Sequence, residues 1–347
     1  MAEVVSLADA HDDSRFGAKA TGLGAAARAG LPIPPGIALS GAIVDEIAAG
    51  KERAVEQVAS LAHALVAPLA VRSSAVDEDG AEASFAGQQL TLLNVPSVDD
   101  VSAAVREIWW SANSDSAITY RQRVGLFTRP SVGVVVQSLL PADVAGVMFT
   151  QNPINKADER LIEAAWGLGE VVVAGRVIPD TFRIGRDGTV LERTPGMKKI
   201  AIRAAADGGT VEERVPPERV ERLCLDDQQL AELNALAGRC EEAYGPARDI
   251  EWAFAGGRLY LLQCRAVTSS KSPARQPLSG PVDVIERVPL FASMSPHDVE
   301  GIAALFKERR FAPGETVTRE GAGGAAFFVI QSGEATVSIA GKERATL

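Results

Sequence analysis

A polar stretch near residue 270 separates the chain into two parts, and this break constrains the fold more than any other feature. Residues 269–281 read SSKSPARQPLSGP, a run rich in Ser, Pro and basic residues that has no apolar periodicity. Such a composition is typical of a linker between folded domains. We therefore expect a linker at 269–282, with a large domain before it and a separate small domain at 283–347.

The part before the linker contains both helical and strand patterns. Apolar residues recur at helical spacing in four regions, which are 21–29, 41–66, 98–123 and 225–245. Strands are expected in two apolar runs and two hairpins, at 132–140, 145–150, 180–193 and 249–267. This mixture predicts one α+β unit with an internal hinge.

The composition excludes several classes of protein. The net charge is −10 and the pI is about 5.0, whereas a general nucleic-acid binder needs a basic face. The three cysteines form no CxxC pair, so neither a zinc site nor a disulfide framework is indicated. No apolar run reaches the ~18–20 residues of a membrane span, and the N-terminus lacks the apolar core of a signal peptide. We expect a cytoplasmic protein without nucleic-acid or membrane partners.

Residues 70–95, AVRSSAVDEDGAEASFAGQQLTLLNV, place an arginine, two hydroxyls and a glycine loop between two strand patterns. Arg72 can direct two N–H groups at phosphate oxygens, and Gly87 lets the backbone approach a ligand closely. The alternative is a surface turn with solvated charges. These residues alone leave both interpretations open.

The hairpin at 249–267 carries polar side chains on strands. Alternation gives one face of its first strand to Asp249, Glu251 and Ala253. In its second strand, one face is expected to hold Leu259, Leu261, Gln263 and Arg265. Glu251 and Gln263 share a side only if the turn is odd in length, such as Ala255-Gly256-Gly257, or if the hairpin is bulged. Oxygen ligands beside an arginine suit Mg²⁺ with a nucleotide phosphate, and the alternative is an exposed strand face.

Two glycine patterns near the N-terminus do not indicate a nucleotide fold by themselves. Residues 22–27 match the GxGxxA pattern of dinucleotide-binding folds, but the preceding DDSRFGAKAT is polar and predicts no strand. No GxxxxGK[ST] sequence occurs, so the chain has no P-loop. Lys19 lies just before a helix start, where it either meets an anion or is a plain exposed side chain.

Five segments taken together resemble one family. They are GAKATGLGAAARAGLPIPPGIALS, AVRSSAVDEDGAEASFAGQQLTLLNV, VVVQSLLPADVAGVMFTQNP, IEAAWGLGEVVVAGRVIPDTF and DIEWAF…LYLLQCRAVT. In this order they resemble the ATP-binding domain of phosphoenolpyruvate synthase, pyruvate phosphate dikinase and the rifampicin phosphotransferases, over about residues 1–270. The resemblance implies an ATP-grasp fold, in which two α+β lobes, at 1–136 and 137–268, clamp ATP.

The resemblance also implies roles for residues of the first lobe and its border. Lys19 and Arg72 would contact phosphates, with Arg72 also catalytic. Gly87 and Thr91 would belong to a glycine loop that closes over these phosphates. Gln137 would lie where the adenine edge is read.

In the second lobe, the resemblance implies a magnesium and phosphate site. Glu251 and Gln263 would hold Mg²⁺ and phosphate oxygens, and Arg265 would be a further phosphate contact with a catalytic role. Glu163 would add to the nucleotide pocket. ATP and Mg²⁺ are therefore the expected cofactors.

The phosphoryl acceptor is not evident in this sequence. In the family, ATP phosphorylates a histidine on a separate swivelling domain, within a TGG…SHA-like segment. The three histidines here, His11, His63 and His297, lie in no such segment. We expect a phosphohistidine domain or protein outside this chain as the partner, so that the chain is incomplete for the family reaction. Two functions stay open, an ATP-dependent phosphotransferase and a non-catalytic, nucleotide-sensing regulatory protein.

Residues 283–347 resemble the beginning of a cyclic-nucleotide-binding domain. Turn signals at 313–315, 320–321 and 332–334 separate short strand patterns, as in a jelly-roll-like β-roll. The family's phosphate-gripping segment would follow Leu347. We therefore expect an incomplete β-roll with a regulatory role, which would bind a cyclic nucleotide only in a longer form.

Overall fold

The computed structural model describes residues 2–75, 90–114, 117–118, 130–153 and 155–267, with short pieces of the C-terminal part. The chain divides into two units, Met1–Ser270 and Lys271–Leu347. In the second unit, the described residues include one antiparallel hairpin, formed by β14 (Thr336–Ile339) and β15 (Lys342–Thr346). The expected linker and most of the expected β-roll lie outside the described residues. The first unit is α+β, as predicted.

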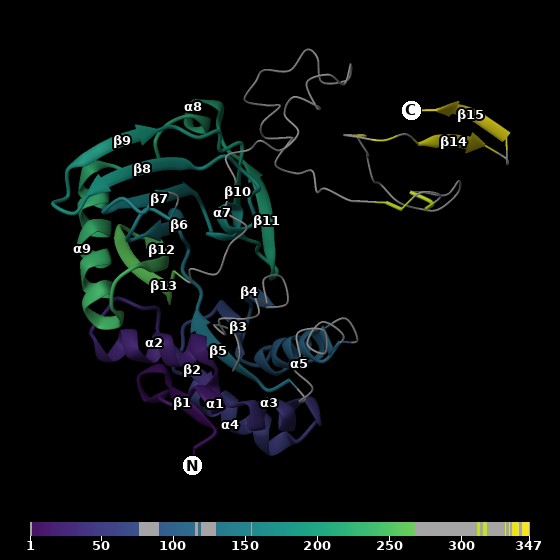
Figure 1. The fold of residues 1–347 in the computed structure, drawn as a ribbon. Helices are drawn as coiled ribbons and strands as arrows, with labels where there is room; N and C mark the ends of the chain where they lie inside the picture. Colours follow the sequence, from purple (N-terminus) through teal and green to yellow (C-terminus); the bar gives the residue numbers. More distant parts are fainter. Residues whose placement is uncertain are drawn as a thin grey trace. The chain divides into compact units, whose positions relative to one another are not determined.

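The first lobe is built on a five-stranded antiparallel sheet (Figure 1). Its strands, in spatial order, are β1 (Val4–Ser6), β2 (Gly36–Leu39), β5 (Val132–Ser138), β3 (Leu69–Ala75) and β4 (Thr91–Val95). One face packs against α3 (Gly41–Ala48), α4 (Glu52–Ala62) and α5 (Val101–Ala112). Because β5 belongs to this sheet and runs to Ser138, the strand crosses the expected lobe border after residue 136.

The opposite face of the first sheet is covered by α2 (Ala18–Arg28), which follows the short α1 (Asp13–Phe16). Gly17, which precedes α2, has φ of +79° and lies so close to β3 that an added Cβ would be 2.0 Å from the Ser74 carbonyl oxygen. Only glycine fits at this approach. The Ala20 N–H then donates to Ser74 Oγ at 3.0 Å. The helix therefore begins directly beside the strand that carries Arg72.

The second lobe is built on a six-stranded antiparallel sheet. Its strands, in spatial order, are β13 (Arg258–Ala266), β12 (Arg248–Ala255), β6 (Val144–Phe149), β7 (Glu159–Trp166), β8 (Asp180–Gly185) and β9 (Val190–Thr194). On one face, Trp252, Phe254 and Phe182 pack against Leu233 and its neighbours on α9 (Asp227–Tyr244). This is the main apolar core of the lobe.

The other face of the second sheet has a smaller apolar cover and then becomes polar. Ala145, Ala165 and Ala253 pack there with α7 (Glu170–Val173) and the strand β10 (Ile200–Ala204). The strand β10 pairs with β11 (Thr210–Arg214), and α8 (Pro217–Val220) follows before α9. Leu93 of the first lobe also packs on this face, so this is the side that meets the first lobe.

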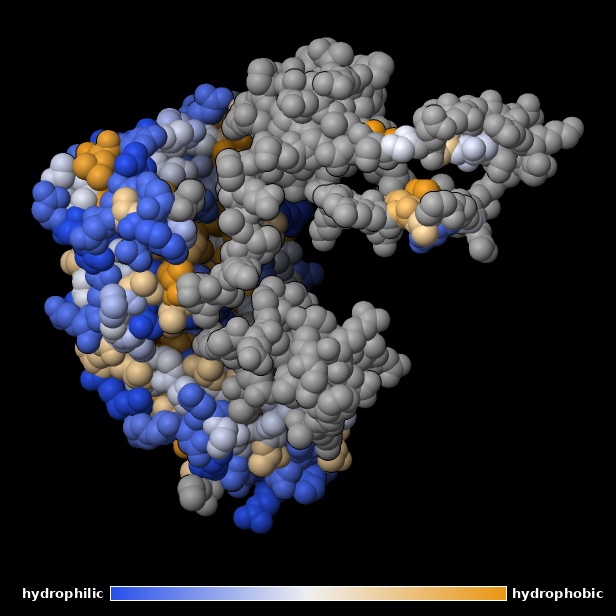
Figure 2. Space-filling model, in the orientation of Figure 1, coloured by the Kyte–Doolittle hydropathy of each residue, from blue (hydrophilic) through white to orange (hydrophobic). Residues whose placement is uncertain are grey.

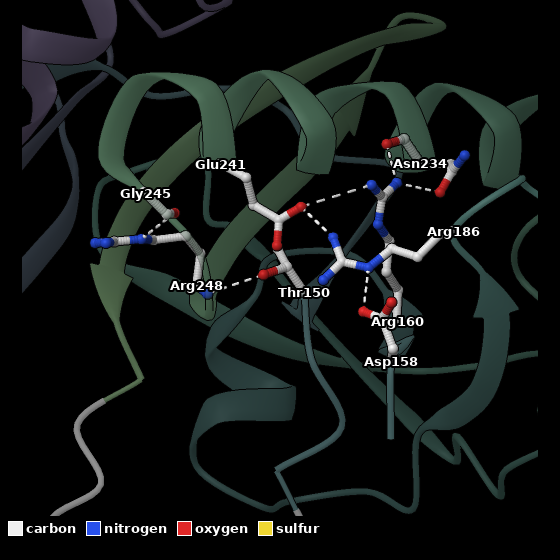
Figure 3. A network of polar contacts seen from close by, with 8 residues as sticks. All are labelled: Thr150, Asp158, Arg160, Arg186, Asn234, Glu241, Gly245 and Arg248. Atoms are coloured by element: carbon white, nitrogen blue, oxygen red, sulfur yellow. Dashed lines mark hydrogen bonds and ion pairs between the residues drawn. The ribbon is translucent and has the colours of Figure 1, made fainter. Parts of the chain in front are cut away.

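The helix α9 is held at both ends and by side chains of the sheet on which it packs. Asp226 and Gln229 form a capping box at its start, and Gly245, with φ of +86°, ends it. Buried Arg160 on β7 donates to the carbonyl and the side chain of Asn234 on this helix, and Arg186 bonds both Asp158 and Glu241 (Figure 3). The helix predicted at 225–245 is thus confirmed.

The two lobes share backbone contacts at the segment that follows α2. Leu31 packs into the core of the second lobe, and the Leu261 N–H donates to the Pro32 carbonyl at 2.7 Å. Two bonds tie the same segment to β5: Gln137 Nε2 donates to the Pro34 carbonyl at 3.0 Å, and the Ser138 N–H donates to the Pro35 carbonyl at 3.0 Å.

A second contact between the lobes is made by the β10–β11 hairpin. Asn94 on β4 is buried and donates to the carbonyls of Ala205 and Gly209, both at 2.7 Å. The Gly209 N–H donates back to the Asn94 carbonyl at 3.1 Å. In Figure 1 this contact and α2 lie on opposite sides of the junction between the lobes.

The visible surface of the second lobe is predominantly hydrophilic, with scattered hydrophobic side chains (Figure 2). None of the helices described in this structure has the length and apolar character needed to cross a membrane.

Candidate functional site

The β12–β13 hairpin has a two-residue turn and a bulge. Ala255 pairs with Arg258, so the turn is Gly256-Gly257, with φ of +56° and +74°. The odd turn suggested by the sequence is therefore wrong. Trp252 pairs with Leu261, but the next pair is Glu251 with Gln263, which leaves Leu262 as an extra residue. The bulged alternative is confirmed, and it places Glu251 and Gln263 on one side of the sheet.

The bulge divides the residues of β13 between the two faces of the sheet. Leu259 and Leu261 pack into the core beneath α9, whereas Gln263 and Arg265 lie opposite Glu251 and Asp249 on the other face. The prediction that these four β13 residues share one face is therefore wrong. One additional residue reverses the alternation, so strict period-two counting fails beyond it.

A row of directly paired residues crosses the polar face of the second sheet. In order across the strands it consists of Gln263, Glu251, Val147, Glu163 and Thr181. Directly paired residues point to the same face, so Glu163 lies on the side of Glu251. Two strand spacings of ~4.8 Å separate their backbones by roughly 10 Å. The structure thus places Glu163 near, but not at, the Glu251–Gln263 pair.

Arg72 extends from the first lobe to this pair. Its Nη2 lies 3.0 Å from Gln263 Oε1 and 3.3 Å from Glu251 Oε2, and its Nη1 donates to the Leu262 carbonyl at 2.9 Å. A bulged residue has no regular ladder partner, which leaves that carbonyl available to the arginine. The side chains of Arg72 and Glu251 are 13% and 20% exposed. The three predicted residues therefore meet at a half-buried position between the lobes.

The pair that follows Glu251 and Gln263 on the same face is Asp249 and Arg265. The two side chains are bonded at 2.9 Å. Burial raises the pKa of the Asp249 carboxyl and the neighbouring Glu251 adds to this effect, while Arg265 opposes it. Strand alternation had placed Asp249 beside Glu251, but the sequence assigned it no role. Its pairing with Arg265 is visible only from the bulged register.

Lys19 of α2 lies beside the same group of residues. Its side chain is buried and Nζ donates to the Ser73 carbonyl at 2.9 Å, directly beside Arg72 in the chain. Lys19 also lines a small pocket together with Gly22, Leu23, Gln263, Cys264 and Arg265, among others. The interpretation of Lys19 as a plain exposed side chain is wrong, because the residue is buried at the junction of the lobes.

The remaining predicted residues lie at different distances from this junction. Thr91 on β4 pairs directly with Arg72. Gln137 pairs with Ala70 on β3 and is buried, and its amide nitrogen donates to the Pro34 carbonyl. Gly87 lies outside the described residues. The predicted loop around Gly87 therefore stays a prediction.

The donors at the junction fit a magnesium ion with a nucleotide. Glu251 and Gln263 present side-chain oxygens to the same arginine, and hard oxygen donors are what Mg²⁺ prefers. Among the residues that the structure describes, no group of three or more His, Cys, Asp or Glu side chains could hold a metal alone. Mg²⁺ commonly completes its shell with water and substrate phosphates, so two protein ligands are sufficient.

Comparison with known proteins identifies relatives of the first unit. The chain is 43% identical over 203 residues to a probable phosphoenolpyruvate synthase of Methanothermobacter thermautotrophicus, covering 58% of this chain and 30% of that protein. It is 39% identical over 218 residues to phosphoenolpyruvate synthase of Pyrococcus furiosus, covering 59% and 27%. It is 35% identical over 295 residues to the prodigiosin synthesizing transferase PigC of Serratia marcescens, covering 77% and 33%.

The matched part of the chain thus spans between 27% and 33% of the length of these three relatives. A family model of the pyruvate phosphate dikinase AMP/ATP-binding domain matches residues 39–280, which is most of the chain. This protein belongs to the family of the pyruvate phosphate dikinase AMP/ATP-binding domain.

Proposed function

We propose that the first unit binds Mg-ATP between its two lobes as the ATP-binding part of a phosphoenolpyruvate synthase-like phosphotransferase. One observation carries the proposal: Arg72 of the first lobe meets Glu251 and Gln263 of the second lobe. A cation, a carboxylate and an amide oxygen from two lobes are suited to a magnesium–phosphate group placed between them. The family match and the two α+β lobes support an ATP-grasp assignment.

In this proposal the cations of the site bind and orient the phosphates. Arg72 exchanges its contacts to the second lobe for phosphate oxygens, and Lys19 reaches the same phosphates from α2. Arg265, oriented by Asp249, is the third cation. Positioning and charge neutralisation are the main demands of phosphoryl transfer, and these three side chains supply both.

Glu251 and Gln263 are the proposed Mg²⁺ ligands. Bound there, Mg²⁺ would neutralise charge on the phosphate oxygens. Glu163 on the same face, Thr91 beside Arg72, and Gly87 complete the proposed nucleotide site. Gln137 would read the adenine edge with the part of its amide that does not bond Pro34.

The phosphoryl acceptor in this proposal is a histidine on a separate domain or partner protein. Several relatives are named phosphoenolpyruvate synthase, which supports such a reaction. The lobe borders near residue 136 and the regulatory cyclic-nucleotide module at 283–347 stay part of the proposal, resting on the sequence pattern. The competing function, nucleotide sensing without transfer, predicts ATP binding but no phosphohistidine on a relative's swivelling domain added in trans.

Replacing Arg72 with alanine tests the nucleotide site. Losing one charge-assisted phosphate contact should cost about 1.5–3 kcal/mol, or roughly ten- to a hundredfold in ATP affinity. Isothermal titration of ATP with Mg²⁺ measures this loss. The matched control is Arg193→Ala. Arg193 lies on the edge strand β9 and forms an exposed ion pair with Asp227 of α9, so this variant should bind ATP normally. Unchanged affinity in Arg72→Ala would count decisively against the assignment.

A further inference from the structure

The base of the β10–β11 hairpin is fixed to the second lobe. Ile202 of β10 is buried in the apolar cover of the second sheet. The Leu168 N–H donates to the Ile202 carbonyl at 2.9 Å, and Gly167 lies so close that an added Cβ would be 2.5 Å from the same oxygen. The base of the hairpin therefore moves with the second lobe.

The tip of the hairpin, at residues 205–209, contacts the first lobe. The buried Asn94 amide donates to the Ala205 and Gly209 carbonyls, and the Gly209 N–H donates back to the Asn94 carbonyl. Gly208 lies against Pro96, because a Cβ added to it would be 3.0 Å from Pro96 Cγ. The tip is therefore held to β4 by three hydrogen bonds and a close contact with a proline.

The attachment of the lobes at the segment after α2 is of a different kind. Leu31 is buried in the core of the second lobe, and the Leu261 N–H donates to the Pro32 carbonyl at 2.7 Å. Separation at this segment would expose Leu31 to water, which is unfavourable. Separation at Asn94 exchanges hydrogen bonds within the protein for hydrogen bonds to water, and the net cost of such an exchange is small. The Asn94 contact is therefore the one that opens more easily.

The Asn94 contact also lies close to the candidate nucleotide site. Leu93, the neighbour of Asn94 on β4, packs against the same apolar cluster of the second lobe as Leu262. The Leu262 carbonyl accepts from Arg72. A movement of β4 away from the hairpin therefore widens the space in which the phosphates are proposed to bind.

We propose that the β10–β11 hairpin is a strap across the two lobes, and that its release from Asn94 is the opening step through which the nucleotide enters and leaves. The separate opening of the strap stands on the contacts between the lobes alone. The gating of the nucleotide rests on the proposed function. Entry and release both pass through the open state, so weakening the strap raises the rates of both.

Hydrogen exchange of the full-length protein without nucleotide tests the separate opening. The Gly209 amide, which bonds Asn94, should be at least about tenfold less protected than the Leu261 amide, which bonds Pro32. In Asn94→Ala the protection of Gly209 should fall further, while that of Leu261 stays the same. Equal protection of both amides in the native chain would overturn the strap, because both would then exchange in one common unfolding event.

Stopped-flow kinetics of the fluorescent analogue mant-ATP with Mg²⁺ test the gate. Asn94→Ala should raise the association and release rates about tenfold each and change the affinity much less. Gly208→Ala is the second variant, because the added Cβ meets Pro96 and strains a backbone φ of +105°. It should raise both rates in the same way. Gly188→Ala, in the β8–β9 turn with φ of +88°, is the matched control and should leave both rates unchanged.

Each part of the proposal has an outcome that overturns it. Unchanged rates in both Asn94→Ala and Gly208→Ala would overturn the gate, whatever the exchange result. Faster release with unchanged association would also overturn it, because Asn94 would then stabilise only the bound state. If the native chain fails to bind mant-ATP, the proposed function fails and the gate with it, while the two amides still decide whether the strap opens.

Discussion

Asp180 and Lys198 form an ion pair in which neither side chain has exposed surface. The Asp180 carboxylate also accepts from the backbone N–H groups of Gly196 and Cys224, both at 2.7 Å. One carboxylate at the start of β8 therefore holds two loops and one buried ammonium group. A buried carboxylate is stable only while its charged and hydrogen-bonding partners are present, so the loss of one partner should lower the stability of the fold markedly.

Replacing Lys198 with methionine should lower the free energy of unfolding by about 3–5 kcal/mol, because the Asp180 charge would stay buried without its counter-ion. Urea denaturation followed by circular dichroism measures this change. The double variant Asp180→Asn with Lys198→Met removes both charges and should recover part of the loss. A loss below about 1 kcal/mol in the single variant would show that the pair is not buried as described.

Glu159 makes stability depend on pH. It is buried at the start of β7, bonded to Arg183 at 2.8 and 3.0 Å and to Asn152 at 2.7 Å. The hydrogen bonds from Arg183, followed by that from Asn152, lower the pKa of Glu159 below its ordinary value of 4.5. A carboxyl whose pKa is lower in the folded state stabilises the fold above its unfolded pKa, and this contribution is lost as the pH falls.

The variant Glu159→Gln should therefore be less stable than the native chain at pH 7, by a margin that shrinks as the pH falls below 4.5. Urea denaturation at a series of pH values measures the margin. Glu56→Gln, at an exposed position on α4, is the control and should show no such trend. A margin that grows on acidification would contradict the prediction.

Among the elements, the β10–β11 hairpin has an unexpected role, because it joins the second lobe to β4 through Asn94. Asn94 has φ of +60°, a conformation that asparagine tolerates better than most residues. Its side-chain amide donates hydrogen bonds to two carbonyls of the hairpin. No described residue of β11 is buried, so an apolar pattern could not have predicted this strand.

Replacing Asn94 with alanine should destabilise the first unit by about 1–3 kcal/mol, because the two hydrogen bonds from its buried amide to the Ala205 and Gly209 carbonyls are lost. Hydrogen exchange should show faster exchange at Gly209, whose N–H bonds the Asn94 carbonyl. The control is Asn113→Ala, which removes a side-chain bond to the Trp109 carbonyl at the end of α5 and should leave Gly209 exchange unchanged. Unaltered Gly209 exchange in Asn94→Ala would argue against a role in joining the lobes.

The elements with strong periodicity could be predicted from the sequence, and their register could not. The helix ending at Gly245 and the hairpin at 249–267 have clear patterns, and both are present. The bulge at Leu262 has no sequence signal, yet it decides which residues of β13 face the site. Arg72 and Leu262 are 190 positions apart, so their contact depends on the packing of two sheets. Only the family resemblance brought these residues together beforehand.

At the scale of the whole molecule, the first unit has its own cores and ends at Ser270. The six-stranded and five-stranded sheets both lie within it, and so do all the described residues of the candidate site. A unit with its own apolar cores is expected to fold alone.

A chain ending at Ser270 should therefore fold cooperatively and bind ATP with the affinity of the full chain. Thermal unfolding with and without Mg-ATP, together with titration, measures both properties. Aggregation of the shortened chain would be ambiguous alone, so limited proteolysis of the full chain is the companion test, and it should release a stable fragment of this size. Rapid digestion of that fragment would contradict an independent first unit.

The segment that follows α2 is one of two places where the lobes are attached to one another. Leu31 is embedded in the core of the second lobe, while the carbonyls of Pro34 and Pro35 are bonded to β5 of the first. Asn94 of β4 makes the other attachment, through its hydrogen bonds to the β10–β11 hairpin. With two attachments, one lobe cannot rotate about either of them without breaking hydrogen bonds at the other.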